Sequence, residues 1–233
     1  MRTRHCITVI ALLFPATLNA QIGRGPYARI AVLRPHDGQT TEFEAGYLRH
    51  LAWHRQAGDT WSWYGWSIWA ADRYRWFVYA TFNHSAASFD SVVSPAEDER
   101  DNLLNVAPHV EWVENALYEF LPTLSRGNGE PQPTSRLEFM KVEVLPGGGK
   151  AFEAAIAMAQ STLISETLWY RMIAGGSAPR YVRLRPRAGL GGVLDGRNEQ
   201  PLPDAAGRLI AKLNVEVWTL RPAMSINLVS PSP

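Results

Sequence analysis

The chain has 233 residues, and its 23 Lys and Arg against 22 Asp and Glu give a formal net charge of +1. This near-neutral balance argues against the basic surface that nucleic-acid binding requires, so we expect no nucleic-acid partner. A hydrophobic content of 46 % is typical of a globular protein. The length is sufficient for one large domain or two small ones.

Residues 1–20 have the pattern of a secretory signal peptide. Arg2 and Arg4 precede an apolar run over residues 6–18, and Ala20 stands before a candidate cleavage point. The run is too short to cross a bilayer of about 30 Å as a helix, and no later segment is long and apolar enough to do so. We therefore expect a periplasmic or secreted protein with no integral membrane segment after cleavage. The only cysteine, Cys6, leaves with the signal, which excludes disulfides and thiolate ligands from the mature chain.

Residues 21–124 predict one β-α-β-β-α-β unit. Its elements are expected at 28–34, 40–57, 61–69, 74–82, 94–113 and 116–122. The first helical pattern ends at Gly58, and the aromatic and β-branched residues of the next two segments indicate a hairpin. Ser94-Pro95-Ala96-Glu97 has the pattern of a capping box that begins the second helix.

The same order recurs in residues 136–233, which also include a C-terminal tail. The second set is expected at 136–145, 150–164, 167–174, 180–186, 204–213 and 215–222. Trp63-Tyr64 in the first unit matches Trp169-Tyr170 in the second, and other matches follow in the same order. The segment 125–135, rich in Gly, Pro and polar residues, indicates a linker between the two units.

Each unit has the element order of ferredoxin-like folds. Together with the Trp-Tyr strands and the turn from Phe82 to Asp90, this order resembles the dimeric α/β-barrel superfamily in a fused, tandem-repeat form, and within it NIPSNAP-like and antibiotic-monooxygenase-like proteins. The resemblance implies an α+β fold in which two tandem ferredoxin-like units pack as an intramolecular dimeric α/β barrel, either monomeric or as a homodimer. An enzyme of this superfamily would have monooxygenase-, isomerase- or lyase-like activity, and some members bind haem. Fold alone does not choose between these activities.

The first predicted helix differs from its counterpart at two positions. Phe43, Tyr47, His50 and His54 share one helix face at spacing 4, 3, 4. The second unit has apolar residues on that face, namely Phe152, Ile156, Ala159 and Leu163. Burying an unpaired polar ring costs about 1–3 kcal/mol, so the two histidines need partners.

Three interpretations of the histidine pair remain open. The rings are hydrogen-bonded structural groups, or one of them is a general base or donor in a pocket, or the pair binds a divalent metal or haem. Residues 50–54 lack the Glu of a zincin helix. A third metal ligand would have to come from elsewhere, with His84, Glu44 and Asp90 as candidates. We predict no obligatory cofactor.

The main functional hypothesis is a pocket in the first unit for an apolar or aromatic small molecule. Five of the nine tryptophans fall within residues 61–76, either as core or as the wall of such a pocket. The candidate catalytic residues are His50, His54 and His84. The candidate ligand-binding residues are Tyr47, Trp63, Tyr64, Trp66, Tyr79 and Arg34. The alternative from another class is a non-catalytic envelope interaction module, which would present an exposed apolar patch instead of a pocket.

Overall fold

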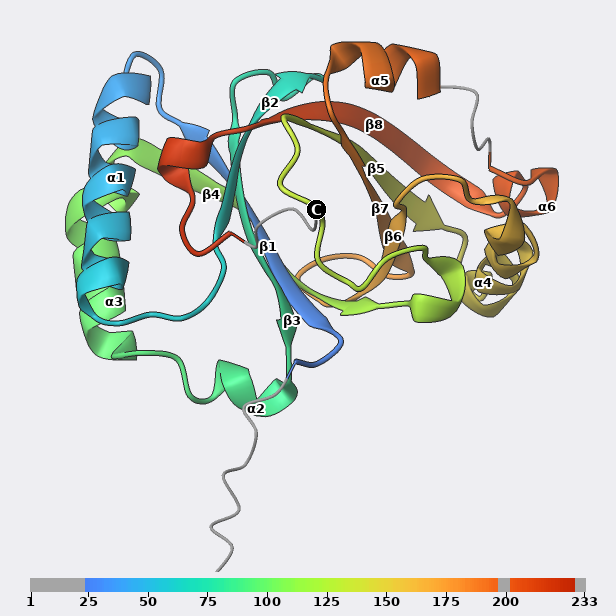
Figure 1. The fold of residues 1–233 in the computed structure, drawn as a ribbon, viewed down its shortest axis with the longest axis horizontal. Helices are drawn as coiled ribbons and strands as arrows, with labels where there is room; N and C mark the ends of the chain where they lie inside the picture. The colour runs from blue at the N-terminus through green and yellow to red at the C-terminus, as the bar shows by residue number, and fades with distance from the viewer. Residues whose placement is uncertain (1–23, 197–201, 229–233) are drawn as a thin grey trace, which may run out of the picture.

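The computed structural model describes residues 24–196 and 202–228. Within these ranges the chain is an α+β protein with six α-helices and eight antiparallel strands, which close into a barrel (Figure 1). The predicted signal segment 1–20 and the last five residues lie outside the described residues. None of the described helices combines the length and the apolar character needed to cross a membrane.

The barrel strands follow the expected order along the chain. The strands are β1 (Tyr27–Pro35), β2 (Tyr64–Ala70), β3 (Phe77–His84), β4 (Val110–Phe120), β5 (Arg136–Val144), β6 (Leu168–Ala174), β7 (Arg180–Arg187) and β8 (Ile210–Leu220). The helices are α1 (Thr40–Gln56), α2 (Ala86–Phe89), α3 (Pro95–Asn105), α4 (Gly149–Met158), α5 (Leu190–Asp195) and α6 (Asp204–Gly207).

Around the barrel the strands run β1-β3-β2-β8-β5-β7-β6-β4. The first half of the chain therefore contributes four neighbouring strands in the order β4-β1-β3-β2, and the second half contributes β8-β5-β7-β6. The pairs β2–β8 and β4–β6 join the two sets. Closure gives every strand a neighbour on both sides, although β4 and β8 meet β6 and β2 only over their last residues.

Helix boundaries differ from the sequence prediction in three places. The helix expected to reach residue 113 ends at Asn105, and that expected over 204–213 is reduced to Asp204–Gly207. In both places the following strand starts early, because β4 pairs with β1 from Val110 onward and β8 pairs with β5 from Ile210 onward. The ladder hydrogen bonds of these β-branched segments replace helical ones. The helix expected over 150–164 also ends early, at Met158.

Ser94 precedes α3 without forming the expected capping box. Its φ is 38°, in the left-handed region, and its side chain makes no capping hydrogen bond. The backbone amides of Glu97 and Asp98 bond instead to the Ser94 carbonyl oxygen. The first turn of α3 is thus closed by backbone bonds alone.

Successive side chains along each strand point alternately into the barrel and out of it, which separates two packing layers. Inward-facing side chains fill the barrel with an aromatic and aliphatic cluster in which the rings of Phe139 and Trp218 stack 4.1 Å apart. Tyr64 and Trp66 belong to this interior. Outward-facing side chains such as Phe77 pack under the helices.

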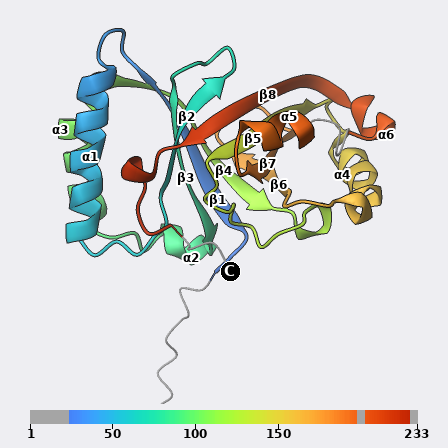
Figure 2. The same cartoon turned by 45° about the horizontal axis from the view of Figure 1, so that its top comes forward.

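The helices cover the barrel from two opposite sides. Figures 1 and 2 show α1 and α3 side by side along the first half, with α4 and α6 at the far end against the second half. Gly46 of α1 sets the spacing of the first pair, because a Cβ there would overlap the carbonyl oxygen of Asn105 in α3. Only glycine allows this close approach of the two helix backbones.

The segment 125–135 packs against the barrel and is largely buried at its centre. Tyr170 donates its hydroxyl hydrogen to the Gly129 carbonyl oxygen at 2.6 Å, and Tyr64 donates to Glu130 at 3.1 Å. Asn83 donates to the other Glu130 carboxylate oxygen at 3.1 Å. These bonds use the hydroxyls of two inward-facing tyrosines.

Candidate functional site

The buried face of α1 changes character along its length. Phe43 and Tyr47 pack on Phe77, with ring centroids 5.3 and 4.7 Å away, and so hold the first turns against the barrel wall. One and two turns further on, His50 and His54 occupy the same face and are each only 6 % exposed. They lie where α1 meets the N-terminal half of α3, so their partners come from that helix and the adjoining loop.

Two aspartates of α3 contact the histidine pair. His50 Nδ1 lies 2.8 Å from Asp101 Oδ1, at hydrogen-bond distance. The Asp98 Oδ1 atom lies 3.4 Å from His50 Nε2 and 3.5 Å from His54 Nε2. The two Nε2 atoms are 3.3 Å apart. The three atoms Nε2, Nε2 and Oδ1 therefore form a nearly equilateral triangle, which we call the His50–His54–Asp98 triad.

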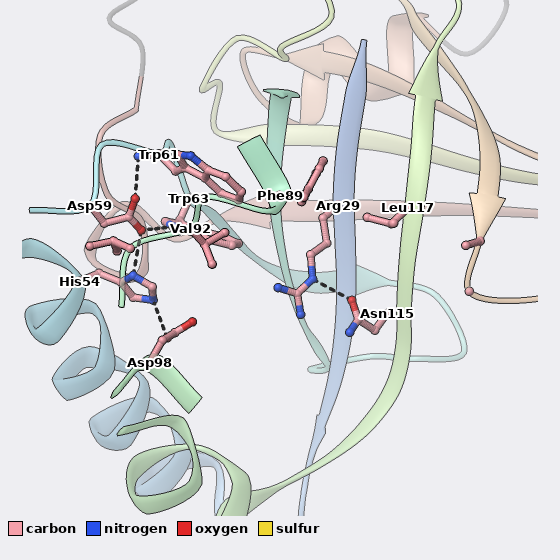
Figure 3. A pocket seen from close by; sticks show the side chains of 13 residues that line it. Arg29, His54, Asp59, Trp61, Trp63, Phe89, Val92, Asp98, Asn115 and Leu117 are labelled. Atoms are coloured by element: carbon pink, nitrogen blue, oxygen red, sulfur yellow. Dashed lines mark hydrogen bonds and ion pairs between the residues drawn. The ribbon is translucent and has the colours of Figure 1, made fainter. Parts of the chain in front are cut away.

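A third aspartate holds His54 from the opposite side. Asp59, in the loop after α1, places Oδ2 2.8 Å from His54 Nδ1 and accepts hydrogen bonds from Trp63 Nε1 and the Trp61 amide. Figure 3 shows His54 between the Asp59 and Asp98 carboxylates. Burial alone would raise the pKa of Asp59, but the adjacent His54 ring and the hydrogen bonds from Trp61 and Trp63 outweigh it and lower that pKa.

Asp101 is positioned by its own helix. Asn105 donates to Asp101 Oδ2 at 3.1 Å and accepts a hydrogen bond from Arg49 Nε at 2.7 Å. This chain of bonds orients the carboxylate that faces His50. Burial lowers the pKa of His50, against the opposing effect of the Asp101 and Asp98 carboxylates.

Two adjoining cavities open beside the triad, with volumes of about 440 and 420 Å³. Both are lined by Arg29, His54, Trp63 and Asp98. We call the combined space the first-half cleft. Ligand pockets typically measure roughly 300–1,000 Å³, so each part has the size of a small-molecule site.

An aromatic wall bounds one side of the first-half cleft. The rings of Trp61 and Trp63 lie 5.8 Å apart, and Phe89 meets Trp61 edge-on at 5.5 Å. His84 lies behind this wall, with its ring 3.8 Å from that of Trp61 and Nε2 bonded to the Thr81 hydroxyl. Burial lowers the pKa of His84 to about 4, so the ring is neutral at physiological pH and supports Trp61.

Arg29 faces the aromatic wall from β1 (Figure 3). Its Nε donates to Asn115 Oδ1 at 2.9 Å, and its guanidinium carbon lies 5.6 Å from the centre of the Tyr79 ring. It forms no ion pair with a carboxylate in residues 24–196 and 202–228. The first-half cleft therefore contains a half-buried cation available to a ligand anion.

The structure brings some of the sequence-predicted residues together and separates others. His50, His54, Tyr47, Trp63 and Tyr79 line the first-half cleft. Burial raises the pKa of both tyrosines, that of Tyr79 to about 12, so both remain neutral hydrogen-bond donors.

The remaining predicted residues lie elsewhere. Tyr64 and Trp66 point into the barrel interior, on the other side of the wall from α1. Arg34 makes an exposed ion pair with Glu111 at 3.7 Å and does not line the first-half cleft. Among the candidate third ligands, Glu44 bonds to Arg221 and Asp90 is exposed, while His84 lies behind the aromatic wall.

Sequence reasoning missed the aspartates and Arg29. Asp98 and Asp101 are three residues apart on a helix without a buried residue, so they resemble ordinary surface charges. The available signal was the pairing of two acidic positions on one covering helix with two histidines on the other. Nothing in the strand pattern distinguished Arg29 from Arg34.

The triad does not have the arrangement that a haem axial ligand needs. An axial histidine must present Nε2 to an open porphyrin face, but each Nε2 here faces the other imidazole and Asp98 within 3.5 Å. The second half has a cavity of about 420 Å³ beside Trp169, but the sequence has no histidine after His109. A histidine-ligated haem therefore fits neither place.

No protein-family model and no curated protein sequence matches the chain. Several solved structures are similar in fold. A proposed monooxygenase from Lactobacillus acidophilus NCFM has a TM-score of 0.57 at 12 % identity over 87 % of this chain and 98 % of that one. An anthrone oxidase-like protein has a TM-score of 0.53 at 10 % identity, over 84 % and 92 %.

The chlorite dismutase from Candidatus Nitrospira defluvii, in complex with imidazole, has a TM-score of 0.56 at 9 % identity, over 86 % and 92 %. All three are dimeric α/β-barrel proteins of ferredoxin-like type. At such identities the likeness shows the fold alone. It places this chain in the same architectural class and leaves its chemistry to the residues of its own site.

Proposed function

We propose that the protein binds a small aromatic molecule carrying an anionic group in the first-half cleft. The observation that carries the proposal is the position of Arg29, a half-buried cation without an ion-pair partner in the described residues, opposite the Trp61–Trp63 wall. A planar apolar body would lie against the indoles. Its acidic group would accept hydrogen bonds from the guanidinium.

We propose export after removal of residues 1–20, and a tandem origin of the two halves, which the shared strand order supports. Most residues that line the cleft come from the first half, with Ala174 and Gly175 added from the second, and we propose that this is the ligand site. A transformation of the bound molecule would be of the monooxygenase, isomerase or lyase kind.

The test uses two dyes that share one ring system. 8-Anilinonaphthalene-1-sulfonate carries an anion, and N-phenyl-1-naphthylamine does not. Removal of a charge-assisted hydrogen bond is worth about 1.5–3 kcal/mol, and each 1.4 kcal/mol is about tenfold in Kd. Arg29→Ala should weaken sulfonate binding about tenfold or more while leaving the uncharged dye unaffected. Trp61→Ala should weaken both.

Arg34→Ala is the matched control, because it removes an arginine of the same strand outside the cleft. Fluorescence titrations in 1 mM EDTA, where no free metal contributes, supply the dissociation constants. Equal effects of Arg29→Ala and Arg34→Ala on the sulfonate dye would overturn the proposal. So would a wild-type protein that binds neither dye at a single saturable site.

A further inference from the structure

We propose that His50, His54 and Asp98 bind one divalent first-row transition-metal ion at the edge of the first-half cleft. The three atoms that face one another are two imidazole nitrogens and one carboxylate oxygen. Imidazole and carboxylate ligands suit Zn²⁺, Fe²⁺, Co²⁺ and Ni²⁺. The inference rests on the geometry of the triad and on the groups behind it, independently of the dye-binding proposal.

The distances within the triangle match those between ligand atoms that coordinate one metal ion. Its sides are 3.3, 3.4 and 3.5 Å. The centre of an equilateral triangle with such sides lies about 2.0 Å from each vertex, and typical Zn–N and Zn–O bonds are about 2.0–2.2 Å. An ion slightly above the plane of the triangle would therefore reach all three atoms without any movement of α1 against α3.

The two distances to Asp98 argue against direct hydrogen bonds between the rings and this carboxylate. Charge-assisted N–H···O bonds are about 2.7–2.9 Å long. The outer contacts, His50 to Asp101 and His54 to Asp59, are both 2.8 Å and fit this range in length. Only the first also has the angles of a hydrogen bond, because His54 Nδ1 has no hydrogen-bond partner among the described residues. The inner contacts to Asp98 are longer by more than half an ångström. Thus the outer contacts have hydrogen-bond lengths, and the inner ones have the separation of two ligands on one ion.

The outer aspartates fix the tautomers that a metal site requires. A carboxylate only accepts hydrogen bonds, so the proton of the His50 ring lies on the Nδ1 atom that bonds to Asp101. The Asp59 carboxylate, 2.8 Å from His54 Nδ1, electrostatically favours a proton at the same position in the second ring. Both Nε2 lone pairs then point into the triangle. Aspartate behind a ligating histidine is the usual outer shell of such sites, where it orients the ring and increases its basicity.

In this arrangement three lone-pair-bearing atoms face one another, and a cation between them would stabilise them. Asp98 Oδ1 is buried and has no hydrogen-bond partner among the described residues, although the rest of its side chain is partly exposed. Two lone pairs and a carboxylate oxygen within 3.5 Å repel one another. A divalent ion at the centre would offset this repulsion.

The position of the triad gives the ion an access route. His54 and Asp98 line both parts of the first-half cleft, so coordination positions beyond the three protein ligands would open toward it. Three protein ligands with open positions are typical of catalytic metal sites rather than structural ones. The second half has no counterpart, because no histidine follows His109.

The experiment uses the full mature chain, stripped with EDTA and dialysed metal-free. Zn²⁺ is titrated by isothermal calorimetry, and Co²⁺ by visible absorption. We expect one equivalent of each, with Co²⁺ ligand-field bands that indicate four or five ligands. Asp98→Asn and His54→Gln should abolish tight binding. Asp101→Asn should weaken it by about 10–100-fold, as loss of an outer-shell partner does.

Two controls remove similar side chains outside the triad. Glu97→Gln changes an exposed carboxylate in the first turn of the same helix, and His36→Gln removes an exposed histidine. Both should bind Zn²⁺ like the wild type. Circular dichroism verifies that each variant folds, and if His54→Gln does not, Asp98→Asn decides. No uptake by the wild type, or equal uptake by Asp98→Asn, would overturn the inference while leaving the dye result in EDTA unaffected.

Discussion

Gly46→Ala should destabilise the protein, although alanine normally stabilises a helix interior. The new Cβ would lie 2.9 Å from the Asn105 carbonyl carbon and closer still to its oxygen. Ordinary carbon contacts are about 3.5–4.0 Å. Relieving both the carbon contact and the shorter oxygen contact would therefore require α3 to move away from α1 by more than about 1 Å. The overlap is with backbone atoms and not with the end of a flexible side chain, so the overpacking cost lies in the upper part of the usual range, at about 2–3 kcal/mol. The better helix propensity of alanine returns about 1 kcal/mol.

The net expected loss is about 1–2 kcal/mol, which lowers Tm by roughly 2–8 °C for a chain of this size. The shift would also separate Asp98 and Asp101 from the histidines, so Zn²⁺ binding should weaken in the same variant. Gly191→Ala is the matched control, since Gly191 lies in a helix with open space around its Cα. Differential scanning calorimetry should show opposite signs for the two variants. A Gly46→Ala protein as stable as Gly191→Ala would refute the proposed spacing role.

Two further predictions concern groups beside and beneath the site. His84 has a pKa lowered to about 4 by burial, partly offset by Asp59, so the unfolded chain binds more protons between about pH 6.5 and 4. Stability should therefore fall as pH falls through that window, and His84→Gln should flatten this part of a plot of Tm against pH; an unchanged slope would contradict the assignment. Tyr64→Phe removes the donor to buried Glu130 and should cost about 1–3 kcal/mol in urea unfolding without changing dye affinity. A loss of dye binding would place Tyr64 in the ligand site instead of the barrel interior.

The sequence predicts the order of strands well because their patterns are local. Aromatic and β-branched runs, with turns between them, locate all eight strands to within a few residues except at the start of β4 and β8. Those two starts depend on pairing with β1 and β5, which are distant in the chain. Helix propensity around residues 106–113 could not reveal that competition.

The side of the barrel wall on which an aromatic residue lies was harder to predict. Trp63 and Tyr64 are neighbours, yet one faces α1 and the other faces the interior. Both sides of the barrel wall are apolar, so the hydrophobicity of a residue does not indicate which side it faces. The histidine pair was identifiable because polar rings stand on a buried helix face, whereas Asp98 became visible only when the fold placed α3 against α1.

A crystal structure of the full chain with 8-anilinonaphthalene-1-sulfonate and Zn²⁺ would show whether the ligand and the metal ion share the first-half cleft. We expect the sulfonate on Arg29, the rings against Trp61 and Trp63, and the ion between His50, His54 and Asp98. Dye density in the second-half cavity beside Trp169, or spread over the outer surface with an empty first-half cleft, would contradict the assignment of the site to the first half.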